Sequence, residues 1–264
     1  MNPAPPTPVL KAEGLSVQLG QRPVLHNLSV AFQAGSITAL CGPNGCGKST
    51  LLRTLGGLLK PAAGEVWLDG QPLHTFAARE RARRLAMLAQ NPLVPEGMQV
   101  QELVATGRYC HTGIAARPGP EDRAAIEAAI ERTHLQGLRT RDLSQLSGGE
   151  RQRAFIAMAL AQGAKVLLLD EPTTFLDIHH QVDVLRLIRD LAQDIGLTVV
   201  WVLHDLNQAA AFSDEMILMK AGALQARGAP EAILQPAVLE PIFDTPMHRI
   251  DADGELVCLP RMRL

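Results

Sequence analysis

The run GPNGCGKST, residues 42–50, matches the pattern G-x-x-x-x-G-K-[ST] of phosphate-binding loops. The apolar run SITALC precedes it and a helical pattern follows it, the context that phosphate binding requires. Glycines in such a loop let consecutive backbone N–H groups converge on phosphate oxygens at the positive end of a helix. Lys48 would neutralise the β and γ phosphates, and the Ser49 hydroxyl would ligate Mg²⁺. The predicted nucleotide-binding residues are Gly42, Pro43, Asn44, Gly45, Cys46, Gly47, Lys48, Ser49 and Thr50.

Further polar residues follow two apolar runs that are predicted to be parallel strands. Asp170 and Glu171 end KVLLLDEP, and ligands of α/β proteins bind at the carboxyl ends of strands. Asp170 is predicted to hold Mg²⁺ through water, and Glu171 to polarise the water that attacks the γ phosphate in line. His204 follows TVVWVL; such a histidine is often only structural, but at the same sheet edge it could reach the γ phosphate.

A third segment, LSGGERQRAFIAMALAQ (146–162), runs from a Ser-Gly-Gly turn into a helical pattern and also looks like a phosphate cradle. Gly-Gly turns are common in loops, so Ser147, Gly148 and Gly149 alone are weak evidence for a phosphate-binding site. They become informative because the other motifs lie before and after them in the same chain.

Composition bounds the class of protein. The chain has 264 residues, of which 47% are hydrophobic, enough for a buried core. Its 25 basic and 27 acidic residues give no excess positive charge for nucleic acid or anionic lipid, so no nucleic-acid partner is expected. Apolar runs such as TVVWVL are far shorter than the roughly 20 residues that cross a bilayer. With no signal-peptide pattern at the start, and four cysteines without Cys-x-x-Cys spacing, a cytosolic protein is expected.

The pattern of elements predicts an α/β fold. Strands are expected at 9–19, 25–32, 36–41, 65–70, 165–172 and 198–205, with helices at 48–59, 121–135 and 179–196. In the first helix Leu51, Leu52, Leu55, Leu58 and Leu59 share one face; in the second, Ile126, Ala129, Ile130 and Thr133 do. A hairpin is expected around Asp253–Gly254, and RERARR (79–84) is predicted to be a solvated helix face.

Taken in order, GPNGCGKST, LSGGERQR, LLLDEP and VLHD resemble the motifs of the ATPase subunits of ABC transporters over nearly the whole chain. The resemblance implies one ABC ATPase domain, 1–264, with a P-loop NTPase core at 9–90 and 160–264. That core has a mixed, largely parallel sheet with antiparallel strands at its N-terminal end. A helical subdomain that carries the signature motif is inserted at 91–159.

The resemblance also implies roles for single residues. Gln90 would link the core to the helical subdomain and sense Mg²⁺ and the γ phosphate, and Asp177 would lie in the loop that crosses between subunits. The turn of Ser147, Gly148 and Gly149 would bind the γ phosphate of ATP held by the other subunit. Two copies would then close head to tail around two ATP molecules as an ATP-dependent, isologous homodimer.

Among ABC ATPases, the chain is most similar to the importers of iron–siderophore, haem and cobalamin, on GPNGCGKSTLLR, GRYCH and DEPTTFLDIHHQVDVL. Such a subunit would sit on the cytoplasmic face of the inner membrane and drive separate permease subunits, with a periplasmic or lipoprotein substrate-binding protein as an indirect partner. Residues 91–112 would receive a short cytoplasmic helix of the permease. Iron–siderophore import is the expected function, and haem or cobalamin import the alternative.

Two other classes compete with this interpretation. A soluble ABC ATPase acting on DNA or ribosomes would resemble the same family but would carry a long coiled-coil insertion or two cassettes in one chain. Neither is present. A GTP-driven switch would need the guanine-reading motif Asn-Lys-x-Asp, which the sequence lacks.

Two residues depart from ordinary expectations. The family has an aromatic residue, usually Tyr, that stacks on adenine, whereas Leu19 stands at the aligned position, with Arg22 as the alternative base contact. Cys46 lies beside Lys48 at a predicted helix N-terminus, and both features predict a lowered thiol pKa and high reactivity.

Overall fold

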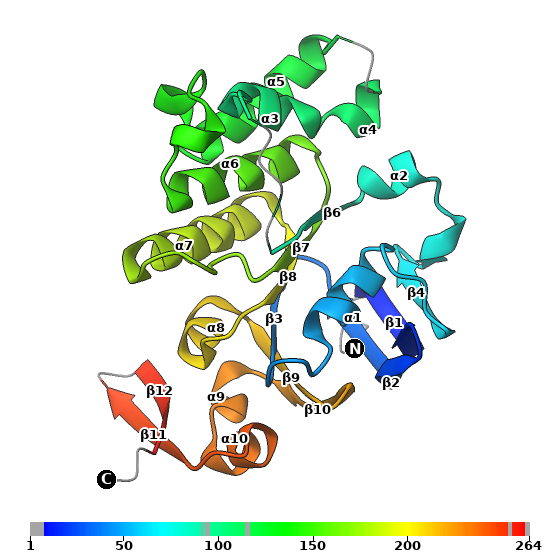
Figure 1. The fold of residues 1–264 in the computed structure, drawn as a ribbon, viewed down its shortest axis with the longest axis vertical. Coiled ribbons are helices and arrows are strands. Elements are labelled where there is room, and N and C mark those ends of the chain that lie inside the picture. Colours follow the sequence, from blue (N-terminus) through cyan, green and yellow to red (C-terminus); the bar gives the residue numbers. More distant parts are fainter. Residues whose placement is uncertain (1–7, 91, 93–95, 114–116, 253–254, 262–264) are drawn as a thin grey trace, which may run out of the picture. The chain divides into compact units, whose positions relative to one another are not determined.

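The computed structural model describes residues 8–90, 92, 96–113, 117–252 and 255–261. Contacts between residues divide the chain into two compact units, one of Met1–His74 with Thr198–Leu264 and one of Thr75–Leu197. Figure 1 shows the elements of both units, coloured along the chain. The first unit contains the phosphate loop, and the second contains the Ser-Gly-Gly turn and Glu171. The boundaries 91–159 for a helical subdomain stay a prediction.

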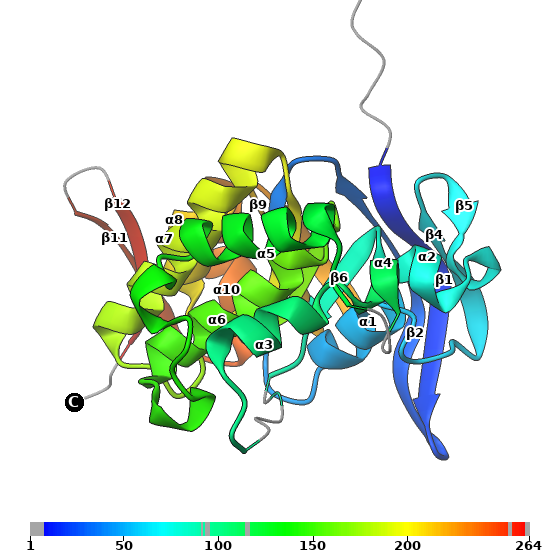
Figure 2. The ribbon, with the colours of Figure 1, turned by 90° about the horizontal axis from the view of Figure 1, so that it is seen from above.

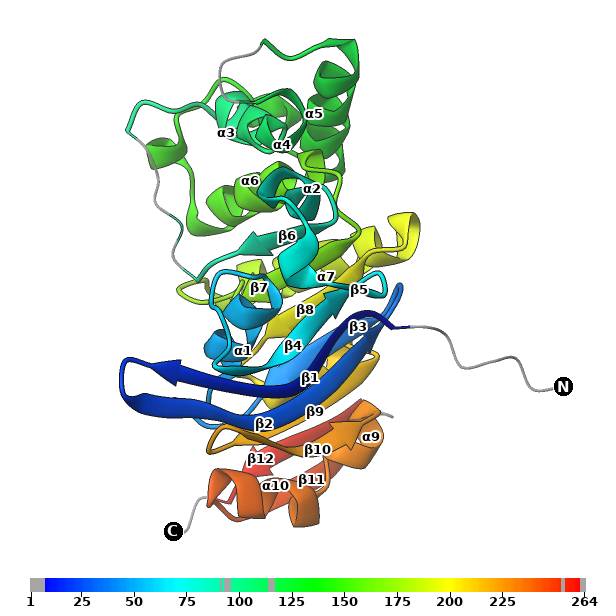
Figure 3. The same ribbon diagram turned by 90° about the vertical axis from the view of Figure 1, so that its right-hand side faces the viewer.

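An antiparallel sheet opens the first unit. Strands β1 (Pro8–Leu19), β2 (Arg22–Gln33), β4 (Ala63–Leu68) and β5 (Gln71–Pro72) pair in the order β2-β1-β4-β5, and Figure 3 shows β1, β2 and β4 side by side. Leu10 and Ala12, and then Leu15 and Val17, are buried because alternate residues of a strand share one face, and an irregularity in the pairing between Ala12 and Leu15 shifts the alternation by one residue. Asp69 and Gly70, between β4 and β5, both have positive φ (50° and 75°), as a tight Asp-Gly turn of a hairpin requires.

Parallel strands support the phosphate loop. In the first unit β3 (Ile37–Cys41) is paired in parallel with both β8 (Thr198–Val202) and β9 (Glu215–Lys220), and β10 (Ala223–Gly228) is antiparallel to β9. Every residue of β3 and β8 is buried, as in parallel strands that are covered on both faces. The phosphate loop therefore follows directly after a fully buried strand, β3.

Helix α1 (Lys48–Leu55) follows the loop and is shorter than predicted. Leu51, Leu52 and Leu55 are buried, but the helix ends at Gly56, and Gly57 has φ 70°. Leu58 is 63% exposed, so the prediction that it shares the buried face is wrong. The glycine pair ends the helix before Pro61 can.

The first unit ends with α8 (Leu206–Phe212), α9 (Pro230–Ile233), α10 (Pro236–Phe243) and a hairpin of β11 (Met247–Ala252) and β12 (Glu255–Pro260). The predicted hairpin is confirmed, while its turn at 253–254 lies outside the described residues. The side chain of Asn207 anchors the hairpin to α8. Its Nδ2 donates to the Cys258 carbonyl at 3.2 Å, and its Oδ1 accepts from the Cys258 N–H at 2.8 Å.

The second unit is mainly helical. It contains α2 (Ala78–Ala82), β6 (Leu85–Leu88), α3 (Val100–Thr106), α4 (Tyr109–Thr112), α5 (Pro120–Arg132), α6 (Gly148–Ala161), β7 (Val166–Asp170) and α7 (Ile178–Ile195), with short 3₁₀ turns at Leu73–Thr75, Gln136–Leu138 and Leu143–Gln145. Strands β6 and β7 are parallel, and α3, α5 and α6 pack together (Figure 2). The predicted α5 face of Ile126, Ala129, Ile130 and Thr133 is buried. Helix α2 buries none of its residues, as expected of RERARR.

The segment GRYCH joins the helices of this unit. The backbone of Gly107 passes so close to α6 that a Cβ there would lie 2.2 Å from the Met158 carbonyl oxygen. Arg108 Nε donates to Asp122 Oδ1 at 2.8 Å, and Arg108 Nη1 donates to the Ala161 carbonyl. These contacts give the segment a structural role.

Among the residues that the structure describes, no helix combines the length and the apolar composition of a membrane span.

Candidate nucleotide-binding site

The phosphate loop has the backbone that its glycines predict. Gly42 (φ 144°) and Gly47 (φ 106°) lie in conformations that L residues rarely adopt. A Cβ would lie 2.2 Å from the Met219 carbonyl oxygen at Gly42, and 2.7 Å from Leu25 Cδ2 at Gly47. Gly47 is also the N-cap of α1 and supplies no side-chain acceptor. The first N–H groups of α1 thus point toward the loop without an intrahelical acceptor, as an anion site requires.

Lys48 lies inside this loop. Its side chain is buried, and Nζ donates to the carbonyls of Gly42 at 2.7 Å and Pro43 at 3.0 Å. The loop's own backbone therefore fixes the ammonium at the mouth of α1. A buried cation in this position can be matched by phosphate oxygens that replace the carbonyl contacts.

Cys46 does not have the activated thiol that the sequence predicted. Its side chain is buried, and this burial raises the pKa of the thiol although the nearby Lys48 charge acts in the opposite direction. Removal from water opposes formation of the thiolate. The expectation of a lowered pKa is wrong, because sequence position reveals the lysine but not the depth of burial.

Glu171 is brought together with Gln90 in the second unit. Gln90 Nε2 donates to Glu171 Oε2, and Thr174 Oγ1 donates to the same oxygen at 2.9 Å. Glu171 directly follows β7 and has φ 54°, a strained conformation for a residue with a Cβ. The strand end thus presents a carboxylate that two neutral donors orient. Thr174 was not predicted, although its place three residues after Glu171 in the turn was the available signal.

Asp170 is the last residue of β7 and is 2% exposed. A carboxyl group so far from water needs a compensating partner. The Asp170 carboxylate and the amide oxygen of Gln90, both in the second unit, and the Ser49 hydroxyl of the first unit are each oxygen donors of the type that Mg²⁺ prefers. The chemistry of these donors therefore fits the ion.

The Ser-Gly-Gly turn begins α6. Ser147 is the N-cap: its Oγ accepts from the Glu150 N–H at 3.3 Å, and Glu150 Oε2 accepts from the Ser147 N–H at 2.8 Å. This reciprocal capping box occupies the N–H groups at both ends of the turn. The N–H groups of Gly148 and Gly149 between them belong to the first helical turn, where no intrahelical acceptor exists.

His204 and Leu19 lie at the surface of the first unit. His204 stands two residues after the end of β8 and is exposed. Leu19 is 47% exposed and is the cross-strand partner of Arg22 at the tip of the β1–β2 hairpin. Leu19 and Arg22, the two candidates for the adenine contact, are therefore both accessible to solvent. Which of them contacts the base stays a prediction.

Asp177 caps a different helix. Its Oδ1 accepts from the His180 N–H at 2.9 Å at the start of α7. Phe175 and Ile178, on either side of it, are 85% and 78% exposed. Large apolar side chains this exposed are typical of a contact surface.

Comparisons with known proteins agree with this geometry. The family model described as ABC transporter matches residues 25–174. The ferric enterobactin transport ATP-binding protein FepC of Escherichia coli (strain K12) is 47% identical over 234 residues, which are 89% of this chain and 86% of that protein. An inward-facing metal-chelate type ABC transporter has a similar structure, with a TM-score of 0.84 and 30% identity over 97% of this chain and 99% of that one. The dimeric structure of a bacterial ABC transporter cassette has a TM-score of 0.73 and 27% identity over 84% of this chain and 98% of that one.

The family match covers more than half of the chain, and the fold of its neighbours is the expected cassette of a mixed sheet with antiparallel strands and added helices. The phosphate loop, the capped Ser-Gly-Gly turn and the strand-end carboxylate follow one another in this order along the chain. This chain belongs to the ABC transporter family, as an ATP-binding subunit that hydrolyses ATP to drive transport.

Proposed function

We propose that this chain powers the uptake of a ferric siderophore through a separate membrane permease. The observation that carries the proposal is the 47% identity to a ferric enterobactin transport ATP-binding protein over 89% of this chain. The likeness to a metal-chelate type transporter supports it. The subunit works at the cytoplasmic face of the inner membrane, bound peripherally to its permease, and a periplasmic or lipoprotein substrate-binding protein delivers the chelate. Haem and cobalamin are the alternative cargoes.

Residues 42–50, which include Lys48, hold the phosphates of ATP. The loop N–H groups and the α1 N-terminus meet the phosphates, and the Lys48 ammonium neutralises the β and γ groups. Ser49, Gln90 and Asp170, the last of these through water, would hold Mg²⁺, and the ion would supply positive charge beside the phosphates. Support comes from the buried Lys48 and from the oxygen-donor chemistry of the three metal-binding residues.

Glu171 supplies the base. Gln90 and Thr174 fix its carboxylate through Oε2, so the group is oriented before the attacking water arrives, and it polarises this water for in-line attack on the γ phosphate. His204 contacts the γ phosphate. Fixing the base in advance lowers the cost of reorganisation during the reaction.

The Ser147–Gly149 turn meets the ATP of a second copy. Its capped serine and the two glycine N–H groups form an anion-binding helix start. Exposed Phe175 and Ile178 become buried in the same head-to-tail contact. The dimeric structure of a similar cassette supports this assembly.

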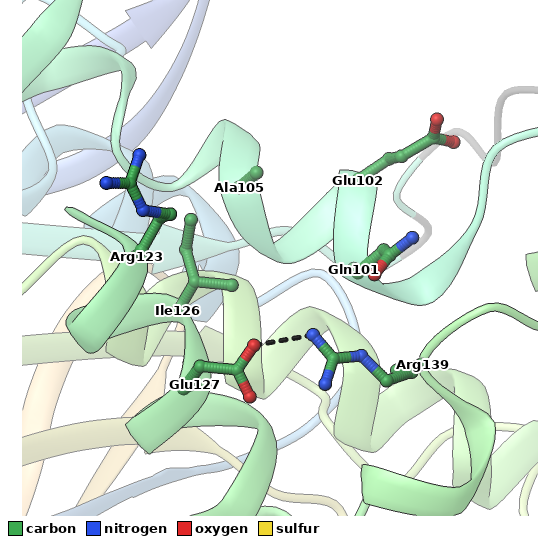
Figure 4. Close-up of a pocket in the computed structure, with 7 residues that line it drawn as sticks. All are labelled: Gln101, Glu102, Ala105, Arg123, Ile126, Glu127 and Arg139. Carbon is green, nitrogen blue, oxygen red and sulfur yellow. Dashed lines mark hydrogen bonds and ion pairs between the residues drawn. The ribbon is translucent and has the colours of Figure 1, made fainter. Parts of the chain in front are cut away.

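The permease docks on the helical part of the second unit. A hollow there is lined by Ala105 of α3 and Ile126 of α5 between polar side chains of both helices, and Arg139 donates to Glu127 at 2.5 Å on its edge (Figure 4). Ala105 lies within residues 91–112, where the family receives a helix of the permease. A small apolar floor with a charged rim suits an amphipathic helix.

Substitution of the base tests the site. Glu171→Gln should bind ATP, hydrolyse it at least about a hundredfold more slowly, and accumulate as an ATP-bound dimer in size-exclusion chromatography with light scattering. Lys48→Ala should lose ATP binding in a fluorescent-nucleotide titration. Glu131→Gln, an exposed residue on α5, is the matched control and should behave as wild type. Near-normal turnover by Glu171→Gln would remove Glu171 from this role.

Transport assays test the cargo. The chain and its cognate permease in proteoliposomes, supplied with the substrate-binding protein, should take up labelled ferric siderophore only with ATP and an intact Glu171. Uptake of haem or cobalamin in place of ferric siderophore would replace the proposed cargo. The ATPase assignment would stand in either case.

A further inference from the structure

The two glycines of the Ser-Gly-Gly turn are covered by the segment that follows Glu171 in the same chain. A Cβ at Gly148 would lie 2.9 Å from Leu176 Cδ2, and a Cβ at Gly149 would lie 2.4 Å from Cδ2 of His180. Real Cβ atoms do not come so close to other heavy atoms, so these side chains lie directly against the turn. The requirement for glycine at position 149 therefore has a local cause, the His180 ring.

The His180 ring is itself fixed. Its Nδ1 donates to both carboxylate oxygens of Asp177, at 2.8 and 2.9 Å, and its backbone N–H donates to Asp177 Oδ1. Gln181 Nε2 donates to the Leu176 carbonyl at 3.0 Å and ties the same segment to the start of α7. The ring is held from one side by the helix cap and rests on Gly149 with the other.

The neighbouring histidine lacks these contacts. His179 has a side chain that is 80% exposed, and its Nε2 lies 3.4 Å from Asp183 on its own helix. The two histidine rings meet edge to face with their centres 5.4 Å apart. Adjacent positions thus carry the same side chain, one against the turn and one in solvent.

We propose that His180 is a positioning residue that holds the Ser147–Gly149 turn in the conformation that receives the partner's ATP. The proposal rests on the head-to-tail dimer of the proposed function. Asp177 orients the ring, and the ring supports Gly149 from behind, so that the turn's N–H groups keep their direction. The segment 171–180 then begins at the carboxylate that serves the chain's own ATP and ends at the support for the other ATP.

The test compares the two histidines in the Glu171→Gln background. His180→Ala should raise the ATP concentration at half-maximal dimer formation roughly tenfold, since displacement of a binding group by about 1 Å has effects of this order or larger. Fluorescent-ATP binding to the monomer should not change, because the phosphate loop of the same chain is intact. His179→Ala should leave both quantities unchanged. Equal dimerisation midpoints for His180→Ala and His179→Ala would overturn the proposal.

Paired substitutions test the contact itself. Gly149→Ala should abolish ATP-dependent dimerisation, and adding His180→Ala should restore it to the level of His180→Ala alone, because the space of the ring becomes free. His180→Phe keeps a ring on Gly149 but loses the hydrogen bonds from Nδ1 to Asp177, so its dimerisation midpoint should lie between those of the parent and of His180→Ala. A double variant as defective as Gly149→Ala would show that the methyl group obstructs something other than His180.

Hydrogen exchange gives a measurement that needs no dimer. In the monomer, the amides of Glu150 and Arg151, which donate to the Ser147 side chain and carbonyl, should exchange faster in His180→Ala than in His179→Ala, while α7 beyond its first turn stays protected. Unchanged exchange at the turn would contradict a supporting role for the ring. Failure of the Glu171→Gln parent to dimerise would count against the dimer of the proposed function, and the exchange result would still decide the role of His180.

Discussion

At the scale of single residues, Leu19 and Arg22 are the two candidates for the contact with adenine. They are cross-strand partners at the hairpin tip and both are exposed. A leucine covers a base with apolar surface but has no π system, whereas a guanidinium can stack on it.

Leu19→Tyr should tighten ATP binding about tenfold, because base–aromatic stacking is worth roughly 1–3 kcal/mol and leucine already supplies part of the burial. The maximal rate should barely change, since the base is remote from the γ phosphate. A titration with a fluorescent ATP analogue measures the affinity, and Arg22→Ala is its companion. Unchanged affinity for Leu19→Tyr with a large loss for Arg22→Ala would identify Arg22 as the adenine platform.

Residue chemistry was predictable where a motif fixes the backbone. Gly42 and Gly47 have the positive φ values that their pattern implies, whereas the hydrogen bond from Gln90 to Glu171 was not predicted. Thr174 and His180 were missed, because their roles depend on which side chains a turn brings back against a helix. Cys46 was misjudged for the same reason: burial is a property of packing and not of neighbours in sequence.

At the scale of elements, periodicity predicted the buried strands and the face of α5 well. It failed at the end of α1, where the leucine spacing continues through Leu58 but Gly56 and Gly57 end the helix. Backbone entropy at a glycine pair outweighed the apolar pattern. The segment GRYCH was recognised only as a subgroup motif, and its contacts with α5 and α6 make it a structural joint.

The ion pair between Arg108 of the GRYCH segment and Asp122 of α5 should make the stability of the second unit depend on pH. Hydrogen bonds from the Arg108 side chain and then the Gly119 N–H lower the pKa of Asp122. A lowered folded-state pKa gives stability that is present above the ordinary value of 3.8 and is lost as pH falls through the folded-state value. Thermal unfolding by circular dichroism should show Asp122→Asn less stable than wild type at neutral pH, with the difference narrowing below about pH 4.

The control variant is Asp190→Asn, which replaces an exposed carboxylate on α7. Its melting temperature should equal that of wild type at every pH. If the difference in melting temperature between Asp122→Asn and wild type is constant from pH 7 to pH 3, the ionised Arg108–Asp122 pair does not contribute to stability.

At the scale of the whole molecule, transport requires that ATP hydrolysis be coupled to a membrane permease. Ala105→Trp should fill the hollow of Figure 4 and block assembly with the permease while basal ATPase activity of the isolated subunit persists. Co-purification with a tagged permease measures assembly. Ala124→Trp, exposed on α5 and outside the hollow, should assemble normally, and normal assembly by Ala105→Trp would place the docking surface elsewhere.

The left-handed backbone of Glu171 implies a trade-off between durability and catalysis. A residue with a Cβ at φ 54° carries strain of the order of 1 kcal/mol, and glycine would relieve it. Glu171→Gly should therefore be more stable to urea than Glu171→Ala by about 1 kcal/mol, since both lose the contacts to Gln90 and Thr174. Both variants should be inactive in hydrolysis. The two variants therefore isolate the backbone strain that a side chain at this position carries from the hydrogen bonds that the glutamate makes to Gln90 and Thr174.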